Sequence, residues 1–253
     1  MKTDRIYYPP GTLIYTGDYT GQETKMELYS FDESEYTINQ ITSIDEVPST
    51  PQKKWLNITG FNNIDIIREI GQHYVISDMV LEDILKTDHR SKLEFVDEQL
   101  FAVLKMVYLK NDKIVHEQLS ILVLDNLILT FQEIEGDVFD TIRDRIVNGK
   151  GNVRNLNIDY LFYSMLDAIV DHYYTALEFV ETLIDQVEEL VMNEEKHVME
   201  RIYSTKKDLI FLGSSILPIK ASDISTRWSF KSLKKAFVES LTRPKSSEIR
   251  FLT

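Results

Sequence analysis

The stretch that decides the fold is residues 158–192, IDYLFYSMLDAIVDHYYTALEFVETLIDQVEELVM. It contains no proline or glycine, and its apolar residues recur at intervals of three and four, which is the spacing of one helical face. We therefore predict one helix of roughly 35 residues, about 50 Å long. Because a globular core seldom needs a helix of that length, it must extend beyond the core or pack on a second helix. The apolar row of this helix comprises Leu161, Met165, Ile169, Tyr173 and Leu177.

The segment that follows, residues 194–212, offers that second helix. Its candidate contacts to the first helix are Val198, Ile202 and Leu209, and Pro218 lies past its predicted end. Residues 158–212 are therefore predicted to form a long antiparallel helical hairpin.

Upstream of this hairpin the apolar pattern changes to short alternating runs that are rich in aromatic and branched residues, which indicates strands. The Asp125-Asn126 pair between the last two runs is typical of a tight hairpin turn. The predicted strands are residues 11–15, 25–29, 54–59, 92–96, 100–109, 115–124 and 127–132.

Two short helices are expected between the third and fourth of these strands. Asn62 or Asn63 can cap the first, which places Ile64, Ile67 and Ile70 on one face, and Ser77-Asp78 can start the second. The residues that the second helix is expected to bury are Met79, Val80, Leu81, Ile84 and Leu85.

Strands first and helices later indicate an α+β fold, in which a mixed β-sheet flanked by helices is followed by the acidic helical hairpin. We divide the chain into a sheet domain (1–150), the hairpin (151–216) and a basic tail (217–253).

Composition excludes several classes of site. The 253 residues include no cysteine, so disulfides, zinc–thiolate sites and thiol nucleophiles are ruled out. The five histidines show no pair at a helical spacing that would converge on one metal ion. No window approaches the 18 or more apolar residues of a spanning helix, so we expect the chain as written to be soluble. The net charge of −13 argues against nucleic acid as a partner.

The charge is unevenly distributed. Residues 155–195 contain ten acidic residues and no lysine or arginine, whereas residues 196–253 carry twelve Lys/Arg against five Asp/Glu, a net charge of +7. Asp167 and Asp171 form a like-charge i, i+4 pair, which costs helix stability. Hydrated divalent cations, the basic tail or salt could each offset this repulsion. From composition alone, the commonest meaning of such a face is that it keeps the helix soluble.

Glu82 and Asp83 add two carboxylates to an otherwise apolar short helix. Adjacent helical residues diverge by about 100°, so these two suit neighbouring sites, or one site and one solvent position. Magnesium prefers carboxylate oxygens and retains several of its waters. Because the sequence contains no phosphate-binding glycine loop, nucleophile elbow or metal-hydrolase histidine pattern, we do not expect an enzyme.

Seven segments, in this order, resemble the cytosolic domain of the CorA family of magnesium and cobalt channels. They are PPGTLIYTG (9–17), WLNITG (55–60), VLEDIL (80–85), KLEF (92–95), FAVLKM (101–106), TFQEIEGDVFD (130–140) and DYLFYSMLDAIVDHYY (159–174).

The resemblance implies a homopentamer on the cytoplasmic side of the cell membrane, in which Mg²⁺ bound between neighbouring cytosolic domains holds the pore closed. It implies metal ligands at Glu82, Asp83 and Asp167, with Asp171 one helical turn further along. The family's two membrane helices and Gly-Met-Asn string are missing, so we expect the chain alone not to conduct ions. The Asp-His pair of the family's stalk helix is also missing after Pro218, so the basic tail is a partial or diverged stalk segment.

Two alternatives remain at this stage. Oxygen ligands do not reveal the ion, so the chain could belong to a zinc or cobalt carrier of the same superfamily. It could also be an acidic scaffold whose hairpin binds a basic partner without metal.

Overall fold

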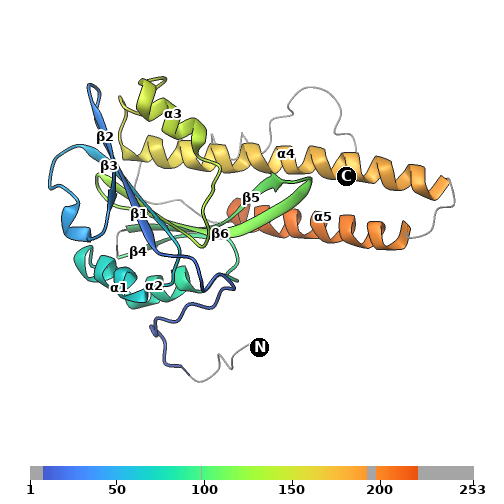
Figure 1. Cartoon of the computed structure of the whole chain (residues 1–253), viewed down its shortest axis with the longest axis horizontal. Helices are drawn as coiled ribbons and strands as arrows, with labels where there is room; N and C mark the ends of the chain where they lie inside the picture. Colours follow the sequence, from blue (N-terminus) through green and yellow to red (C-terminus); the bar gives the residue numbers. More distant parts are fainter. Residues whose placement is uncertain (1–7, 98, 193–197, 222–253) are drawn as a thin grey trace.

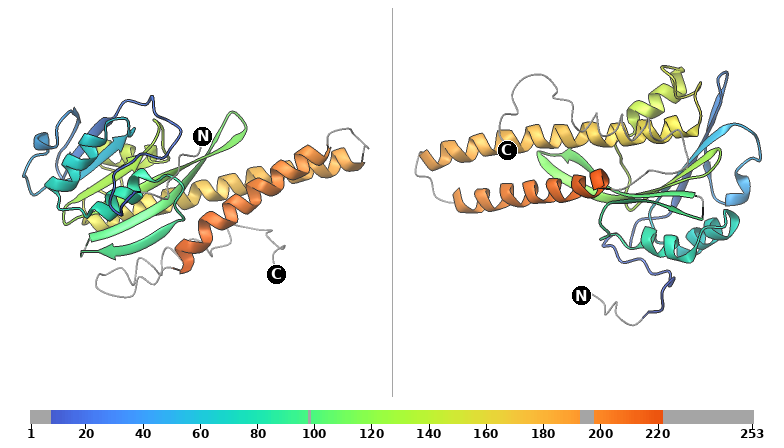
Figure 2. Two further views of the ribbon diagram at one scale, coloured as in Figure 1. Left: turned by 90° about the horizontal axis from the view of Figure 1, so that it is seen from below. Right: turned by 180° about the vertical axis from the view of Figure 1, so that it is seen from behind.

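The computed structural model describes residues 8–97, 99–192 and 198–221. One mixed sheet is covered by helices on both faces, and two long helices extend away from it side by side (Figures 1 and 2). The predicted α+β class is confirmed.

The sheet has seven strands in the order β2-β1-β3-β7-β6-β5-β4. Among these strands β3 and β7 pair in parallel and all other neighbours pair antiparallel. The predicted turn at Asp125-Asn126 joins β6 to β7, and Leu124 N–H donates to Leu127 O across it at 2.8 Å. The strands are β1 (Lys25–Phe31), β2 (Tyr36–Ile41), β3 (Lys53–Thr59), β4 (Lys92–Val96), β5 (Gln99–Lys110), β6 (Lys113–Val123) and β7 (Leu127–Gln132).

The prediction of a strand at residues 11–15 is wrong. This N-terminal segment has no regular structure and runs alongside the second helix, where Thr16 N–H donates to Leu85 O at 3.1 Å. Leu13 and Tyr15 pack on the core from there. An extended segment with one apolar side shows the same alternation as a strand, so the pattern could not separate the two.

Two short helices, α1 (Ile64–His73) and α2 (Asp78–Leu85), cover one face of the sheet (Figure 1). Both predicted starts are confirmed, because Asn63 Oδ1 accepts from Asp65 N–H at 3.1 Å and Ser77 Oγ accepts from Val80 N–H at 3.4 Å. Four of the five residues expected to be buried by α2 are buried. Met79 is 67% exposed, because α2 packs on the sheet with only one face and Met79 lies outside that face.

Helices α3 (Asp140–Asn148) and α4 (Ile158–Met192) cover the opposite face, and the bounds of α4 are those predicted. Along α4, the row from Leu161 to Tyr173 is buried against this face of the sheet, while Leu177 is half-buried. Burial of α4 ends near Val180, so the rest of the helix extends beyond the sheet.

Helix α5 (Val198–Ala221) returns along α4 as predicted (Figure 2). The predicted contact face is wrong in part, because Ile202 and Leu209 are 38% and 40% exposed. Among the described side chains of α5, those up to residue 215, the buried ones are Thr205, Leu212 and Ser215, and the first two lie one heptad apart.

Pro218 lies inside α5 rather than after it. Although proline removes one backbone hydrogen bond from a helix, α5 continues past Pro218 to Ala221. Of the predicted basic tail (217–253), residues 222–253 lie outside the described residues. Within the part of the chain that the structure describes, no helix is long and apolar enough to cross a membrane.

Candidate metal-binding site

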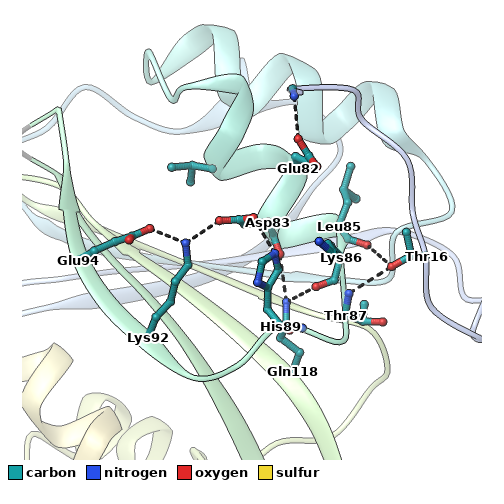
Figure 3. A network of polar contacts seen from close by, with 12 residues as sticks. Thr16, Glu82, Asp83, Leu85, Lys86, Thr87, His89, Lys92, Glu94 and Gln118 are labelled. Carbon is teal, nitrogen blue, oxygen red and sulfur yellow. Dashed lines mark hydrogen bonds and ion pairs between the residues drawn. The ribbon is translucent and has the colours of Figure 1, made fainter. Parts of the chain in front are cut away.

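Two of the four predicted carboxylates lie on α2 and point in different directions, as predicted (Figure 3). Glu82 points toward the N-terminal segment, where its Oε2 accepts a hydrogen bond from Gly11 N–H at 2.7 Å. Asp83 points toward β4 and the loop that precedes it. Both side chains are half-buried. Helix α2 therefore presents two separate carboxyl positions.

Both carboxylate oxygens of Asp83 have partners. Oδ1 lies 2.7 Å from His89 Nε2, and Oδ2 lies 2.6 Å from Lys92 Nζ. Burial opposes ionisation of Asp83, but the hydrogen bonds and charges of His89 and Lys92 outweigh it and lower the pKa of the carboxyl group. Asp83 is therefore anionic at neutral pH.

Lys92, the first residue of β4, is shared between two carboxylates. Its Nζ also lies 2.5 Å from Glu94 Oε1, which is on the same side of β4 two residues further on. The Lys92 ammonium sits 5.3 Å from the centre of the Phe101 ring. Burial lowers the pKa of Lys92, but Asp83 and Glu94 raise it by more, so the amine is protonated.

A buried glutamine fixes the end of α2 to the sheet. Gln118 on β6 donates from Nε2 to the Asp83 and Lys86 carbonyl oxygens at 3.1 and 2.9 Å, and its Oε1 accepts from His89 N–H at 3.1 Å. Lys105 Nζ lies 3.3 Å from the same oxygen. The backbones that carry Asp83 and His89 are thus held by the same rigid side chain.

The other two predicted ligands, Asp167 and Asp171, lie on α4. Asp167 is half-buried and Asp171 is exposed one turn away. Because α2 and α4 pack on opposite faces of the sheet, one chain does not bring Asp167 together with Glu82 and Asp83 (Figure 1). Consistently, the described residues include no group of three His, Asp or Glu side chains that could hold a metal ion.

The chain therefore carries two separated carboxylate positions, which we name the α2 half-site (Glu82 and Asp83) and the α4 half-site (Asp167 and Asp171). Their chemistry fits a hydrated Mg²⁺ or Co²⁺ ion, since such ions use one or two carboxylates and retain waters. At the α2 half-site the ionised Asp83 can act as a metal ligand if His89 or Lys92 moves away from its carboxylate oxygen.

One buried acid was missed by the sequence reasoning. Glu117 on β6 is only 4% exposed, and burial, together with the neighbouring Glu133 carboxyl, raises its pKa to about 8. Its Oε2 accepts from Ile134 N–H at 3.2 Å, and its Oε1 has no hydrogen-bond partner among the described residues. The only signal in the sequence was an acid at an inward position of an alternating strand. An uncharged carboxyl is a poor metal ligand, so Glu117 is not part of either half-site.

Comparison with known proteins places these features in a family. The model of the CorA-like Mg²⁺ transporter protein family matches residues 53–228. The cobalt/magnesium transport protein CorA of Thermotoga maritima is 39% identical over 220 residues, which make up 84% of this chain and 62% of that protein. The chain thus spans less than two thirds of this relative.

Solved structures share the fold. The soluble domain of CorA from Methanocaldococcus jannaschii matches with a TM-score of 0.65 and 17% identity, over 85% of this chain and 88% of that one. The cytoplasmic domain of ZntB from Vibrio parahaemolyticus matches with a TM-score of 0.62 and 15% identity, over 87% and 89%.

Proposed function

This chain belongs to the CorA family, and from that premise we propose that it is the cytosolic regulatory domain of a channel for Mg²⁺ or Co²⁺ in the cell membrane. In this proposal the sheet domain (1–150) and the helical hairpin (151–216) sense divalent cations, and the membrane-spanning part lies in sequence that this chain does not include. The choice of ions follows the name of the Thermotoga relative.

The observation that carries the proposal is the placement of the two half-sites on opposite faces of one sheet. Because the two half-sites cannot meet within one chain, a complete site requires a second molecule. If the α2 face of one copy meets the α4 face of the next, the contact is head-to-tail, and such contacts generate closed rings when the rotation allows it. A homopentamer is the ring that the family resemblance implies.

Electrostatics then provides the switch. Carboxylates that two copies bring together repel each other, even where Lys92 and His89 offset part of the charge of Asp83, and a bound divalent ion supplies two positive charges that offset this repulsion. The interface therefore has a closed state when the ion is bound and a loosened state when it is lost. Because few protein ligands replace the waters of a reluctantly dehydrated ion, we expect affinity in the millimolar range, which suits sensing of cytosolic magnesium.

Thermal melting with and without about 20 mM MgCl₂ tests this function. With a dissociation constant of about 1 mM, bound Mg²⁺ stabilises the folded protein by about 1.8 kcal/mol, a rise in melting temperature of roughly 4–7 °C. The Asp83→Ala/Asp167→Ala double variant should lose this rise.

A matched double variant on the exposed part of α4, Glu181→Ala/Asp185→Ala, removes the same number of carboxylates and should keep the rise. If the first pair of substitutions leaves the magnesium shift unchanged, these residues are not the site. Equilibrium dialysis against Mg²⁺, Co²⁺, Ni²⁺ and Zn²⁺ then identifies the ion. A protein that binds none of them would be the acidic scaffold instead.

A further inference from the structure

The α2 half-site already contains a cation of its own. Lys92 Nζ lies 2.6 Å from Asp83 Oδ2 and 2.5 Å from Glu94 Oε1, so a single ammonium is divided between two carboxylates (Figure 3). On the other side of the same carboxylate, His89 Nε2 lies 2.7 Å from Asp83 Oδ1. An arriving cation therefore does not meet a bare carboxylate.

We propose that Lys92 is a built-in counter-ion that a divalent cation must displace from Asp83, and that Glu94 is the acceptor that retains Lys92 after displacement. The inference rests on the proposed function, because it takes Asp83 to be a metal ligand. It assigns to Lys92 the role of setting the affinity of the α2 half-site.

The geometry favours displacement of Lys92 over displacement of His89. Lys92 starts β4, which is an edge strand of the sheet, and its ammonium has a second acceptor in place. Its four-carbon stem can rotate, and its ammonium lies over the Phe101 ring, 5.3 Å from the ring centre. The backbone N–H of His89, in contrast, is hydrogen-bonded to the buried Gln118. Lys92 can thus leave Asp83 by a small movement without losing its charge partner.

The counter-ion also provides a reason for weak binding. The negative charge of Asp83 is compensated before any metal arrives, so a divalent ion gains only the difference between its own attraction to Asp83 and that of Lys92. Removing the ammonium should therefore tighten binding. We expect about a tenfold gain in Mg²⁺ affinity, which corresponds to about 1.4 kcal/mol.

The test compares the MgCl₂ concentration that gives half of the maximal rise in melting temperature, at fixed ionic strength, for the full chain and its variants. Lys92→Met removes the charge and retains an apolar stem over Phe101, and Lys92→Gln is a second neutral variant in case the first does not fold. Both should move the half-maximal concentration about tenfold lower.

Two controls separate a local effect from a change in net charge. Lys92→Arg keeps the positive charge and should not tighten binding. Lys113→Met removes one positive charge at the exposed first residue of β6, so its half-maximal concentration should equal that of the wild type.

The outcomes distinguish this inference from the function on which it rests. If Asp83→Ala weakens Mg²⁺ binding but neither Lys92→Met nor Lys92→Gln tightens it, the counter-ion role is wrong and the metal site stands. The counter-ion role is also wrong if Lys113→Met tightens binding as much as Lys92→Met. If Asp83→Ala binds Mg²⁺ like the wild type, the α2 half-site itself is refuted.

Discussion

Replacing Glu117 by glutamine should make the protein less sensitive to rising pH. Glu117 is buried on β6 next to the segment that follows β7, with one carboxyl oxygen accepting from Ile134 N–H and the other without a partner among the described residues. Glutamine has nearly the same shape, can still accept the Ile134 hydrogen bond and does not ionise. The substitution therefore isolates the effect of charge at this position.

The direction of the pH dependence follows from the pKa of Glu117 in the folded and in the unfolded chain. The pKa of Glu117 is 4.5 in its ordinary environment and about 8 in the folded protein. Between pH 4.5 and pH 8 the unfolded chain releases a proton that the folded protein retains, so raising the pH favours unfolding, and the loss levels off above pH 8. At 1.36 kcal/mol per pH unit this loss amounts to at most about 5 kcal/mol. The glutamine variant does not show this loss of stability, because its side chain does not ionise.

Urea unfolding followed by circular dichroism at pH 5, 6, 7 and 8 measures the difference. The free energy of unfolding of Glu117→Gln minus that of the wild type should increase by several kcal/mol from pH 5 to pH 8. The exposed Glu33→Gln variant controls for the loss of one carboxylate. If the difference for Glu117→Gln stays constant within about 0.5 kcal/mol over this range, the reasoning on burial is refuted.

Two further substitutions test the fold. Val75 is 80% exposed and has a φ of +53°, which is costly for a β-branched residue, so Val75→Asn should stabilise the protein by about 1 kcal/mol in the same assay. A lower stability would contradict the assignment of strain. Thr130 Oγ1 accepts from Trp55 Nε1 at 2.8 Å and donates to Asn57 Oδ1 at 2.7 Å, and all three side chains are buried. Thr130→Val leaves both partners unpaired and should cost about 1–3 kcal/mol, and a change within 0.5 kcal/mol would show that the bonds contribute little.

The parts of the fold with a strong local signal could be predicted from the sequence. The apolar spacing of three and four over 35 residues without proline or glycine indicated the extent of α4, and the side-chain caps Asn63 and Ser77 indicated the starts of α1 and α2. Strand β2 was missed because five of its six residues are exposed and it pairs only with β1, so its apolar residues Tyr36, Ile38 and Ile41 do not lie on one face. The contact face of α5 was misassigned because small polar residues occupy much of it.

For the candidate site, too, the local features could be predicted from the sequence and the long-range contacts could not. The sequence identified the carboxylates as a chemical type, and the divergence of Glu82 from Asp83 follows from helix geometry. It could not show that His89 and Lys92 occupy both oxygens of Asp83, because the loop after α2 and the edge strand β4 bring them together only in the folded chain. Nor could it show that Asp167 lies across the sheet, which depends on the order of the strands.

The central claim is that copies of this chain are joined by divalent cations held between carboxylates on opposite faces. Multi-angle light scattering of the wild type and of Asp83→Ala/Asp167→Ala, at zero and at high magnesium concentration, tests it most directly. The account predicts that magnesium shifts the wild type toward five times the 29.6 kDa mass of one chain and has no such effect on the double variant. A wild type whose mass is the same at every magnesium concentration would contradict it.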